Sequence, residues 1–347
     1  MTMMIPVIMN TSFQRLAMID DYVSFIWTGR FYNVGDFELV VSTGRDLSMF
    51  RKDFYVVRDD DDGNAGIIEN LKIESDDDGN EVLIITGRFL PAILARRIIA
   101  VQTTVQGTVS YCVNHLIETN LTNPQASSRK ISNFVLGNHA VSTTMKAQYT
   151  GKNLLDTVVD ICKTYGVGFR TLMNDSHQFV FDLYEGADHT YDQNVLPYVV
   201  FSDKYDNLLS SEYEENYESI ATAVLVAGEG EGRQRKTKWV TTGATGMNRY
   251  EVYKDQRNVQ SDDGEISESE YYDLLEESGK ESLTKYTSAF SGSVSFDNVR
   301  YRQDVNLGDL CVIENSKWGL RTNARLVEVI ESVSEAGVYS IRPTFGV

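Results

Sequence analysis

Cysteine is scarce in this chain of 347 residues, which contains only Cys112, Cys162 and Cys311. The three are odd in number and far apart, which excludes a disulfide framework as the basis of the fold. Each lies among apolar neighbours, so we expect three small buried hydrophobic side chains. This usage is typical of a protein made in a reducing cytosol.

A long hydrophobic run is also missing. Residues 1–9 are apolar, but they lack the basic segment and the cleavage site of a secretion signal. A second candidate, residues 89–101, contains Arg96 and Arg97 and is too short to cross a bilayer. We therefore expect neither export by the usual secretion route nor a membrane-spanning helix.

Positive charge is in short supply. The chain has 32 Lys and Arg against 50 Asp and Glu, which gives a formal net charge of −18 at pH 7. Phosphate contacts need Lys and Arg, so the sequence excludes a basic face for duplex DNA and disfavours adhesion to an anionic membrane. With 42% hydrophobic residues, the composition indicates a folded, soluble protein of two to four domains.

Catalytic and metal-binding motifs are absent as well. The four histidines, His115, His139, His177 and His189, have no zinc-ligand spacing, and no HExxH or GxSxG motif occurs. Cys112 and His115 share one helix face, but both fit a buried stripe. A glycosidase would need two carboxylates at a defined separation, which a sequence does not reveal. We predict no catalytic, cofactor-binding or metal-binding residues and no enzymatic activity.

Two acidic turns, Asp59–Asn64 and Asp76–Asn80, raise the question of calcium. In a calcium loop Gly63 would occupy the sixth position and Glu69 the twelfth, but Arg58 would then occupy the first, where a ligand is required. The flanking residues are typical of strands, and Asp-Gly and Gly-Asn pairs are typical of hairpins. We predict solvated hairpin tips at both turns.

The order of apolar patterns predicts a mainly β fold with α+β insertions. Short runs of Val, Ile, Phe and Tyr fill residues 1–100 and indicate a small barrel or sandwich. Residues 101–194 hold two amphipathic helices, over 108–120 and 154–165, and then two strands over 168–184, which predicts an inserted α+β domain.

The rest of the chain is expected to form a second β region with an insertion of its own. Residues 195–240 and 287–347 have strand patterns, whereas residues 241–286 contain a helix over 269–286. Ser267 and Glu270 form a capping box before that helix.

One turn pattern occurs twice. Asn306-Leu307-Gly308-Asp309 opens the last β region, and Asn33-Val34-Gly35-Asp36 occurs near the start. A second shared pattern, Ile68–Leu71 and Val327–Ile330, precedes a turn and a closing strand in each region. We predict a duplicated β module with other material between the copies; the alternative is two unrelated hairpins with ordinary turn chemistry. The signature residues of these turns and of the last strand are Asn33, Gly35, Asp36, Asn306, Gly308, Asp309, Pro343, Phe345 and Gly346.

The end pattern resembles a known family. Asn306–Asp309, Trp318-Gly319, Arg325–Glu328 and Pro343–Gly346 occur in the order found in the C-terminal barrel of siphophage tail-tip hub proteins. That family includes the N-terminal hub part of tail-associated lysins and is similar to the baseplate hubs of contractile phages. Residues 19–39 and 207–230 agree, so the resemblance covers nearly the whole chain.

This resemblance implies two tube-type antiparallel β-barrels per chain, with inserted domains between and beside them. It implies a homotrimer whose six barrels adapt a sixfold tail tube to a threefold tip and close or open the DNA channel. The implied partners are the distal tail ring protein, the tape-measure protein and a receptor-binding or tip protein. DNA is only a transient cargo of the lumen, and no membrane is involved.

The implied location is the virion tail tip, after synthesis in the host cytoplasm. Lytic members of the family carry their activity in extra C-terminal domains, for which we expect no room here. The alternative function is a tail module that binds or degrades host cell-wall saccharides, with some of the 19 tyrosines stacking on sugar rings. A secreted β-sandwich adhesin is disfavoured because no export signal is found.

Overall fold

The structure is a computed structural model that describes residues 4–61, 63–75, 79–261, 266–283, 287–291, 299–334 and 336–346. A few expectations fall outside this part of the chain. They concern Asp62 and residues 76–78 of the two acidic turns, residues 284–286 of the expected helix, and residues 292–298 of the last β region. Within the described ranges, none of the helices combines the length and the apolar character needed to cross a membrane.

The first β region forms antiparallel strands in which buried and less buried side chains alternate, so that one face covers a core. The strands are β1 (Pro6–Met9), β2 (Arg15–Met18), β3 (Ser24–Arg30), β4 (Asp36–Ser42), β5 (Tyr55–Arg58), β6 (Ala65–Ser75) and β7 (Glu81–Phe89).

The predicted α+β domain follows, and its two helices are confirmed. The side chain of Asn153 caps the second helix by accepting a hydrogen bond of 2.9 Å from the Leu155 N–H, and Gly166 ends it at φ +69°. The elements are β8 (Thr103–Thr108), α1 (Val109–Ile117), β9 (Phe134–Leu136), β10 (Thr144–Tyr149), α2 (Leu154–Tyr165), β11 (Gly168–Met173) and β12 (Phe179–Tyr184).

The second β region contains β13 (Val200–Ser202), β14 (Glu212–Asn216), β18 (Thr287–Ser291), β19 (Leu310–Asn315), β20 (Leu320–Val333) and β21 (Tyr339–Gly346). Its insertion contains β15 (Ala223–Ala227), β16 (Thr237–Thr241), β17 (Glu251–Asp255) and α3 (Glu268–Lys280), which begins with the predicted capping box.

This insertion begins earlier than the sequence suggested. Residues 195–240 were expected to belong wholly to the second β region, but β15 and β16 form a separate three-stranded sheet with β17. The reason is the core of that sheet, in which Val224, Val226 and Val240 pack with Leu274 and Leu275 of α3. Because α3 already buries the apolar face of these strands, they do not have to join the larger sheet to bury it.

Short helical turns connect these elements. They are η1 (Leu47–Met49), η2 (Leu90–Arg96), η3 (Glu118–Thr122), η4 (Ser127–Arg129), η5 (Asp203–Tyr205), η6 (Gly232–Gln234) and η7 (Gly246–Asn248). Of these, η2 is a 3₁₀ helix.

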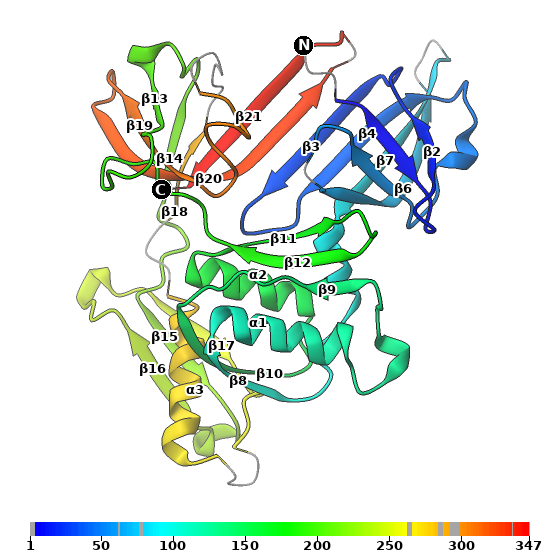
Figure 1. Ribbon diagram of the computed structural model, residues 1–347. Coiled ribbons are helices and arrows are strands. Elements are labelled where there is room, and N and C mark those ends of the chain that lie inside the picture. Colours follow the sequence, from blue (N-terminus) through cyan, green and yellow to red (C-terminus); the bar gives the residue numbers. More distant parts are fainter. Residues whose placement is uncertain are drawn as a thin grey trace.

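The two β regions join in one sheet of 13 strands (Figure 1). Its main path runs β14-β18-β21-β20-β3-β4-β7-β6-β5-β1-β2, and β19 and β13 continue from β20. The two closed barrels expected from the resemblance are not found among the described strands. The sheet is open because β14 pairs only with β18 and β2 only with β1 in that part of the chain.

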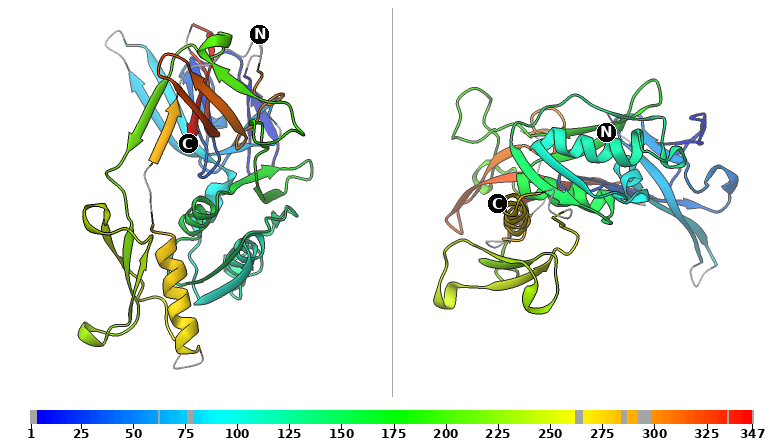
Figure 2. Two further views of the ribbon diagram at one scale, coloured as in Figure 1. Left: turned by 90° about the vertical axis from the view of Figure 1, so that its left-hand side faces the viewer. Right: turned by 90° about the horizontal axis from the view of Figure 1, so that it is seen from below.

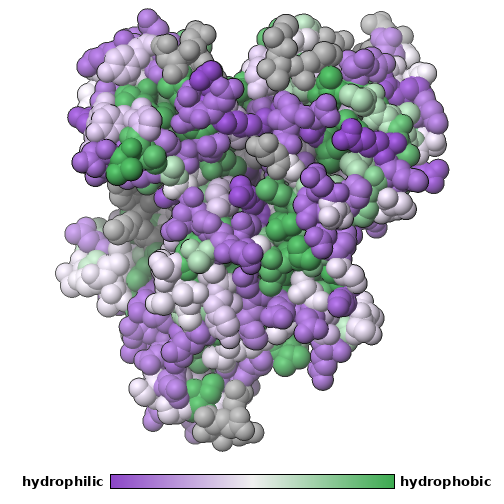
Figure 3. Space-filling model, viewed as in Figure 1, coloured by the Kyte–Doolittle hydropathy of each residue, from purple (hydrophilic) through white to green (hydrophobic). Residues whose placement is uncertain are grey.

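Both inserted domains lie on the same side of the main sheet (Figures 1 and 2). The first β region and the α+β domain share one continuous hydrophobic core, while the second β region and its insertion have smaller cores of their own. Hydrophilic side chains cover most of the face in Figure 3, and hydrophobic ones gather near the middle, where the first β region meets the α+β domain.

Candidate functional site: the junction of two β units

Five strands in each β region follow the same pairing scheme. The first β unit has the order β3-β4-β7-β6-β5, and the second β unit has the order β14-β18-β21-β20-β19. Every neighbouring pair in both orders is antiparallel. The two units are therefore copies of one arrangement of strands.

A β-bulge fixes the register between these copies. The ladder of β6 and β7 shifts between Ile68 and Asn70, and the ladder of β20 and β21 shifts between Leu326 and Glu328. Ile68 thus corresponds to Leu326. The row of paired residues across the sheet is Trp27, Phe37, Gly87 and Ile68 in the first unit, and Tyr213, Phe290, Phe345 and Leu326 in the second.

Backbone hydrogen bonds repeat in the same register. The Asp53 N–H donates to the Ile68 carbonyl at 2.9 Å, and the Gly308 N–H donates to the Leu326 carbonyl at 2.8 Å. In each unit the residue whose carbonyl accepts this bond also donates its own N–H to the carbonyl of the turn residue that follows the donor. Asp53 and Gly308 both have positive φ, +66° and +99°. A duplicated β unit is therefore present, and the turn before β5 corresponds to the turn before β19.

The sequence motifs that suggested this repeat occupy different places in the two units. Gly35 precedes β4, whereas Gly308 precedes β19, which is the counterpart of β5. Gly35 has no positive φ; a Cβ there would lie 2.3 Å from the Thr28 carbonyl oxygen. The second shared pattern is correct to within one residue, because Ile68 corresponds to Leu326 and not to Val327.

The first motif ties its turn to the junction between the units. The Val34 N–H donates to the side chain of Asn33 at 2.8 Å. Asp36 pairs with Arg30, which also reaches Glu328 of β20 at 2.6 Å.

The second motif ties the α+β domain to the second unit. Asp309 is buried, and its carboxylate accepts from the N–H groups of Asn306 and Ala187, each at 2.7 Å. His189 lies 3.5 Å from the same carboxylate. His189 thus lies beside this turn through Asp309.

The remaining signature residues lie in β21. Pro343 pairs with Val329 on one side, and β18 pairs only with residues 344–346 on the other. The described ladder with β18 requires no N–H from Pro343, which suits a residue that has none to donate. Phe345 is buried against Phe201, and Gly346 ends the strand.

The two units meet where β20 pairs with β3. This antiparallel ladder runs from Glu328 opposite Arg30 to Val333 opposite Phe25. Residues about three hundred positions apart in the chain therefore form one continuous sheet at this junction (Figure 1).

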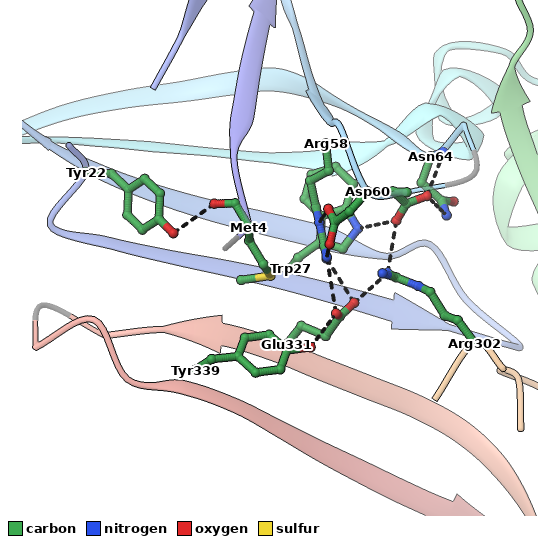
Figure 4. Close-up of polar contacts among 10 residues, drawn as sticks. Met4, Tyr22, Trp27, Arg58, Asp60, Asn64, Arg302, Glu331 and Tyr339 are labelled. Carbon is green, nitrogen blue, oxygen red and sulfur yellow. Dashed lines mark hydrogen bonds and ion pairs between the residues drawn. The ribbon is translucent and has the colours of Figure 1, made fainter. Parts of the chain in front are cut away.

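A buried ion cluster lies at the junction (Figure 4). The Arg58 guanidinium donates to both carboxylate oxygens of Glu331, at 2.9 and 3.2 Å, and to both of Asp60, at 2.9 and 2.7 Å. Arg58 and Glu331 are 4% and 3% exposed. Such bidentate, charge-assisted pairs are strong and directional.

Other side chains complete the cluster. Arg302 Nη2 lies 2.6 Å from Glu331 and 3.2 Å from Asp61, and Trp27 Nε1 donates to Asp61 at 3.1 Å. The Tyr339 hydroxyl donates to Glu331 at 2.8 Å. Glu331 of the second unit is therefore held by groups from both sides of the junction.

The cluster shifts the pKa of its members. Burial alone would lower the pKa of the Arg58 guanidinium, but its bonds to Asp60 and the charge of Glu331 outweigh burial and raise it. Burial alone would raise the pKa of Asp60, but the bonds and charge of Arg58 outweigh burial and lower it. Each ion thus favours the charged form of its partner. Removing one member of a buried pair typically costs about 3–5 kcal/mol, so the cluster fixes how the units join.

A small cavity lies beside the cluster. A cavity of about 150 Å³ beside the cluster is smaller than the sites that usually hold small molecules. Across the described residues, no three His, Cys, Asp or Glu side chains are grouped to hold a metal. Cys112, Cys162 and Cys311 are buried. The contacts of the cluster join strands of the two units.

The cluster as a whole has no local signature in the sequence. The prediction of a solvated tip at Asp59–Asn64 is wrong for Asp61, whose side chain is only 1% exposed and binds Arg302 and Trp27. The available signal was Arg58, a cation at the end of an apolar strand and next to an acidic run. Its partner Glu331 lies 273 positions away, and no local pattern reveals it.

Comparison with known proteins shows which family matches this chain. The family model of the Siphovirus ReqiPepy6 Gp37-like protein matches residues 5–347. The chain belongs to this family. The match confirms the resemblance to siphophage tail proteins, whereas no curated protein sequence matches the chain.

Solved structures agree with the assignment to the Gp37-like family. A tail protein from Neisseria meningitidis MC58 has 15% identity and a TM-score of 0.57, over 100% of this chain and 97% of that one. The 43 kDa tail protein of prophage MuSo2 from Shewanella oneidensis has 11% identity and a TM-score of 0.58, over 98% of each chain. Prophage tail protein gp18 from Listeria monocytogenes EGD-e has 13% identity and a TM-score of 0.54, over 99% and 94%. The chain therefore has the fold of phage tail proteins.

Proposed function

We propose that this Gp37-like protein is the structural hub of a phage tail tip, and that it acts as a homotrimer that adapts a sixfold tail tube to a threefold tip. The observation that carries the proposal is the pair of equivalent β units joined side by side through β20 and β3. A chain with two equivalent units presents two similar surfaces to whatever lies above it.

Symmetry gives the physical reason. Three copies of such a chain supply six β units, so a ring of three chains matches a tube built from six subunits. Among the described residues the sheet of a single chain is open at both ends, and closure of the two tube-type barrels would require neighbouring copies in the ring.

The proposed partners follow from this position. A distal tail ring protein lies above the hub, the end of the tape-measure protein lies inside, and a receptor-binding or tip protein lies below. The protein is made in the host cytoplasm and then resides at the virion tail tip. DNA passes only as a transient cargo, and the net charge of −18 suits a lumen that repels it.

The mass of the purified particle tests the proposal. A trimer has about three times the 39.1 kDa of one chain, and imaging should show a ring with a central hole. A particle that stays monomeric and forms no ring, alone or with a tail ring protein, would contradict the hub. A neutral or basic bore would contradict only the repulsion of DNA.

One surface favours the second candidate, a saccharide-binding or saccharide-degrading tail module. Trp239 and Tyr253 are 44% and 58% exposed and flank Leu225 on the small sheet. However, Arg249 lies over the Trp239 ring at 4.9 Å and Arg235 over the Tyr253 ring at 5.9 Å, so cations already occupy the faces that a sugar would need. Binding to a glycan array, lost in Trp239→Ala, would favour this function over the hub.

A further inference from the structure

Two strand edges of the repeat are open in the described part of the chain. Beyond its short pairing with β5, β6 pairs only with β7, and this hairpin projects from the body (Figure 2, right). At the other end of the sheet, β14 pairs only with β18. An open edge presents backbone groups that a further strand can pair with.

The repeat shows what belongs at the edge of β6. Its counterpart in the second unit is β20, and residues 328–333 of β20 pair with β3. The counterpart of β3 is β14. The contact between β20 and β3 is therefore equivalent to a contact between β6 and β14. The described strands of a single chain form the first of these contacts and not the second.

Exposure of side chains supports this reading. Val329 and Glu331, which face the junction, are 2% and 3% exposed. Their counterparts in β6, Leu71 and Ile73, are 40% and 58% exposed. The difference arises because β3 and its neighbours cover β20, while no described strand covers the same edge of β6. Burying the exposed parts of these two side chains is favourable, because it removes apolar surface from water.

We propose that residues 70–75 of one copy pair, as an antiparallel edge, with residues 211–216 of a second copy, that is, with β14 and the residue before it. The register of the β20–β3 ladder within the chain applies unchanged to this contact between copies. Glu328 opposite Arg30 becomes Asn70 opposite Asn216, and Ile330 opposite Thr28 becomes Lys72 opposite Glu214. The inference rests on the proposed ring and names the edges and the register that close it.

The chemistry of this contact differs from that inside the chain. The counterpart of Arg58 is Ile313, and the counterpart of Glu331 is Ile73. The contact between copies thus has apolar side chains where the internal junction has ions. The Lys72–Glu214 pair favours the stated register, while Glu74 opposite Glu212 opposes it. Because the two edges differ, the contact is heterologous and repeats from copy to copy until a ring closes.

Cysteine pairing between copies tests the register. Two full-length variants, Lys72→Cys and Glu214→Cys, are mixed, oxidised and analysed without reductant. Directly opposed residues lie within reach of a disulfide, whereas diagonal ones, about 7–8 Å apart, do not. We expect a covalent dimer in the mixture and in neither variant alone. The matched control is Lys72→Cys mixed with Glu212→Cys, which should give at least tenfold less.

The outcomes separate this inference from the hub itself. A trimeric ring in which the control pair cross-links as well as the test pair, or in which neither does, overturns the register and leaves the hub standing. Chains that neither assemble nor cross-link, with or without a tail ring protein, overturn both.

A second variant tests the apolar contact. Ile73→Lys should weaken association at least tenfold and leave the unfolding midpoint of the single chain unchanged, since Ile73 is 58% exposed there. Val101→Lys, at a position 65% exposed and outside both edges, is the control and should associate normally. Equal association of the two variants would contradict the proposed edge.

Discussion

The two β units share a ladder of strands but differ in the chemistry of a buried position that corresponds in the two. The first unit has Arg58 and the second has Ile313, both in the strand that flanks the hairpin, and both are buried. Arg58 meets Glu331 across the internal junction, whereas Ile313 lies in the core of its own unit. A repeated backbone scheme therefore does not require repeated chemistry; it requires that each buried group have a suitable neighbour.

The strands beside the repeat differ as well. In the first unit β5 pairs with β1 in an antiparallel ladder, and in the second β19 pairs with β13 in a parallel one. The first unit also shares its core with the α+β domain, while the second has a small core of its own. The five-stranded order is thus the common element, and the surroundings of each copy adapt to it.

The largest effect is expected from removing one side of the ion cluster. Glu331→Ala removes one of the two bidentate partners of the buried Arg58 and leaves Asp60 as the other, so we expect the free energy of unfolding to fall by about 3–5 kcal/mol. Urea denaturation measures this loss. Glu328→Ala, on the same strand but at a partly exposed pair, is the control, with a loss of about 1 kcal/mol or less. Equal losses would show that the cluster does not fasten the two units.

The next effect concerns the turns at corresponding positive φ. Gly308→Ala would place a Cβ 2.5 Å from Phe31 Cε2, and we expect a loss of about 1–3 kcal/mol from overpacking in addition to backbone strain. Gly337→Ala is the matched control, since φ is +71° and no atom lies within 4 Å of the new Cβ. That variant should lose only about 1–2 kcal/mol. If the two lose the same amount, crowding at Gly308 is unimportant.

A smaller effect depends on pH. The folded pKa of Asp60 is below its ordinary value, so its charged form stabilises the fold above the unfolded pKa of about 3.9. This contribution is lost as the pH falls through the folded pKa. Between about pH 5 and pH 2, the wild-type protein should therefore lose more unfolding free energy than Asp60→Asn. Parallel pH profiles for the two proteins would contradict the stabilising role of the Asp60 charge.

The smallest effect is expected at the cysteines. Burial raises the pKa of Cys112 to about 11, and it raises the pKa of Cys162 and Cys311 further. At pH 8 a small disulfide reagent should leave all three thiols unmodified until the protein unfolds, because the thiolate is the reactive form. Labelling of the native protein would show that one of these cores opens readily.

The sequence predicts individual helices and strands better than it predicts how they pair and pack. The helix α2 was predictable from its apolar stripe, from Asn153 at its start and from Gly166 at its end, because these signals are local. The strands β11 and β12 followed from similar patterns. The sequence also indicates the repeat, but it pairs Gly35 with Gly308. Two short turn motifs can have similar sequences and different backbone conformations. Asp53, the true counterpart, gave no such signal.

The sequence by itself determined the β-rich class, the helices α1 and α2 and the membership in a family of phage tail proteins, since periodicity, caps and motif order depend on neighbouring residues. Only the tertiary structure decided that β20 lies against β3, that Arg58 meets Glu331, and that β15 and β16 leave the main sheet. These pairings depend on contacts between apolar faces and between buried charges that lie far apart along the chain. The residues of a strand do not by themselves specify which strand lies beside it.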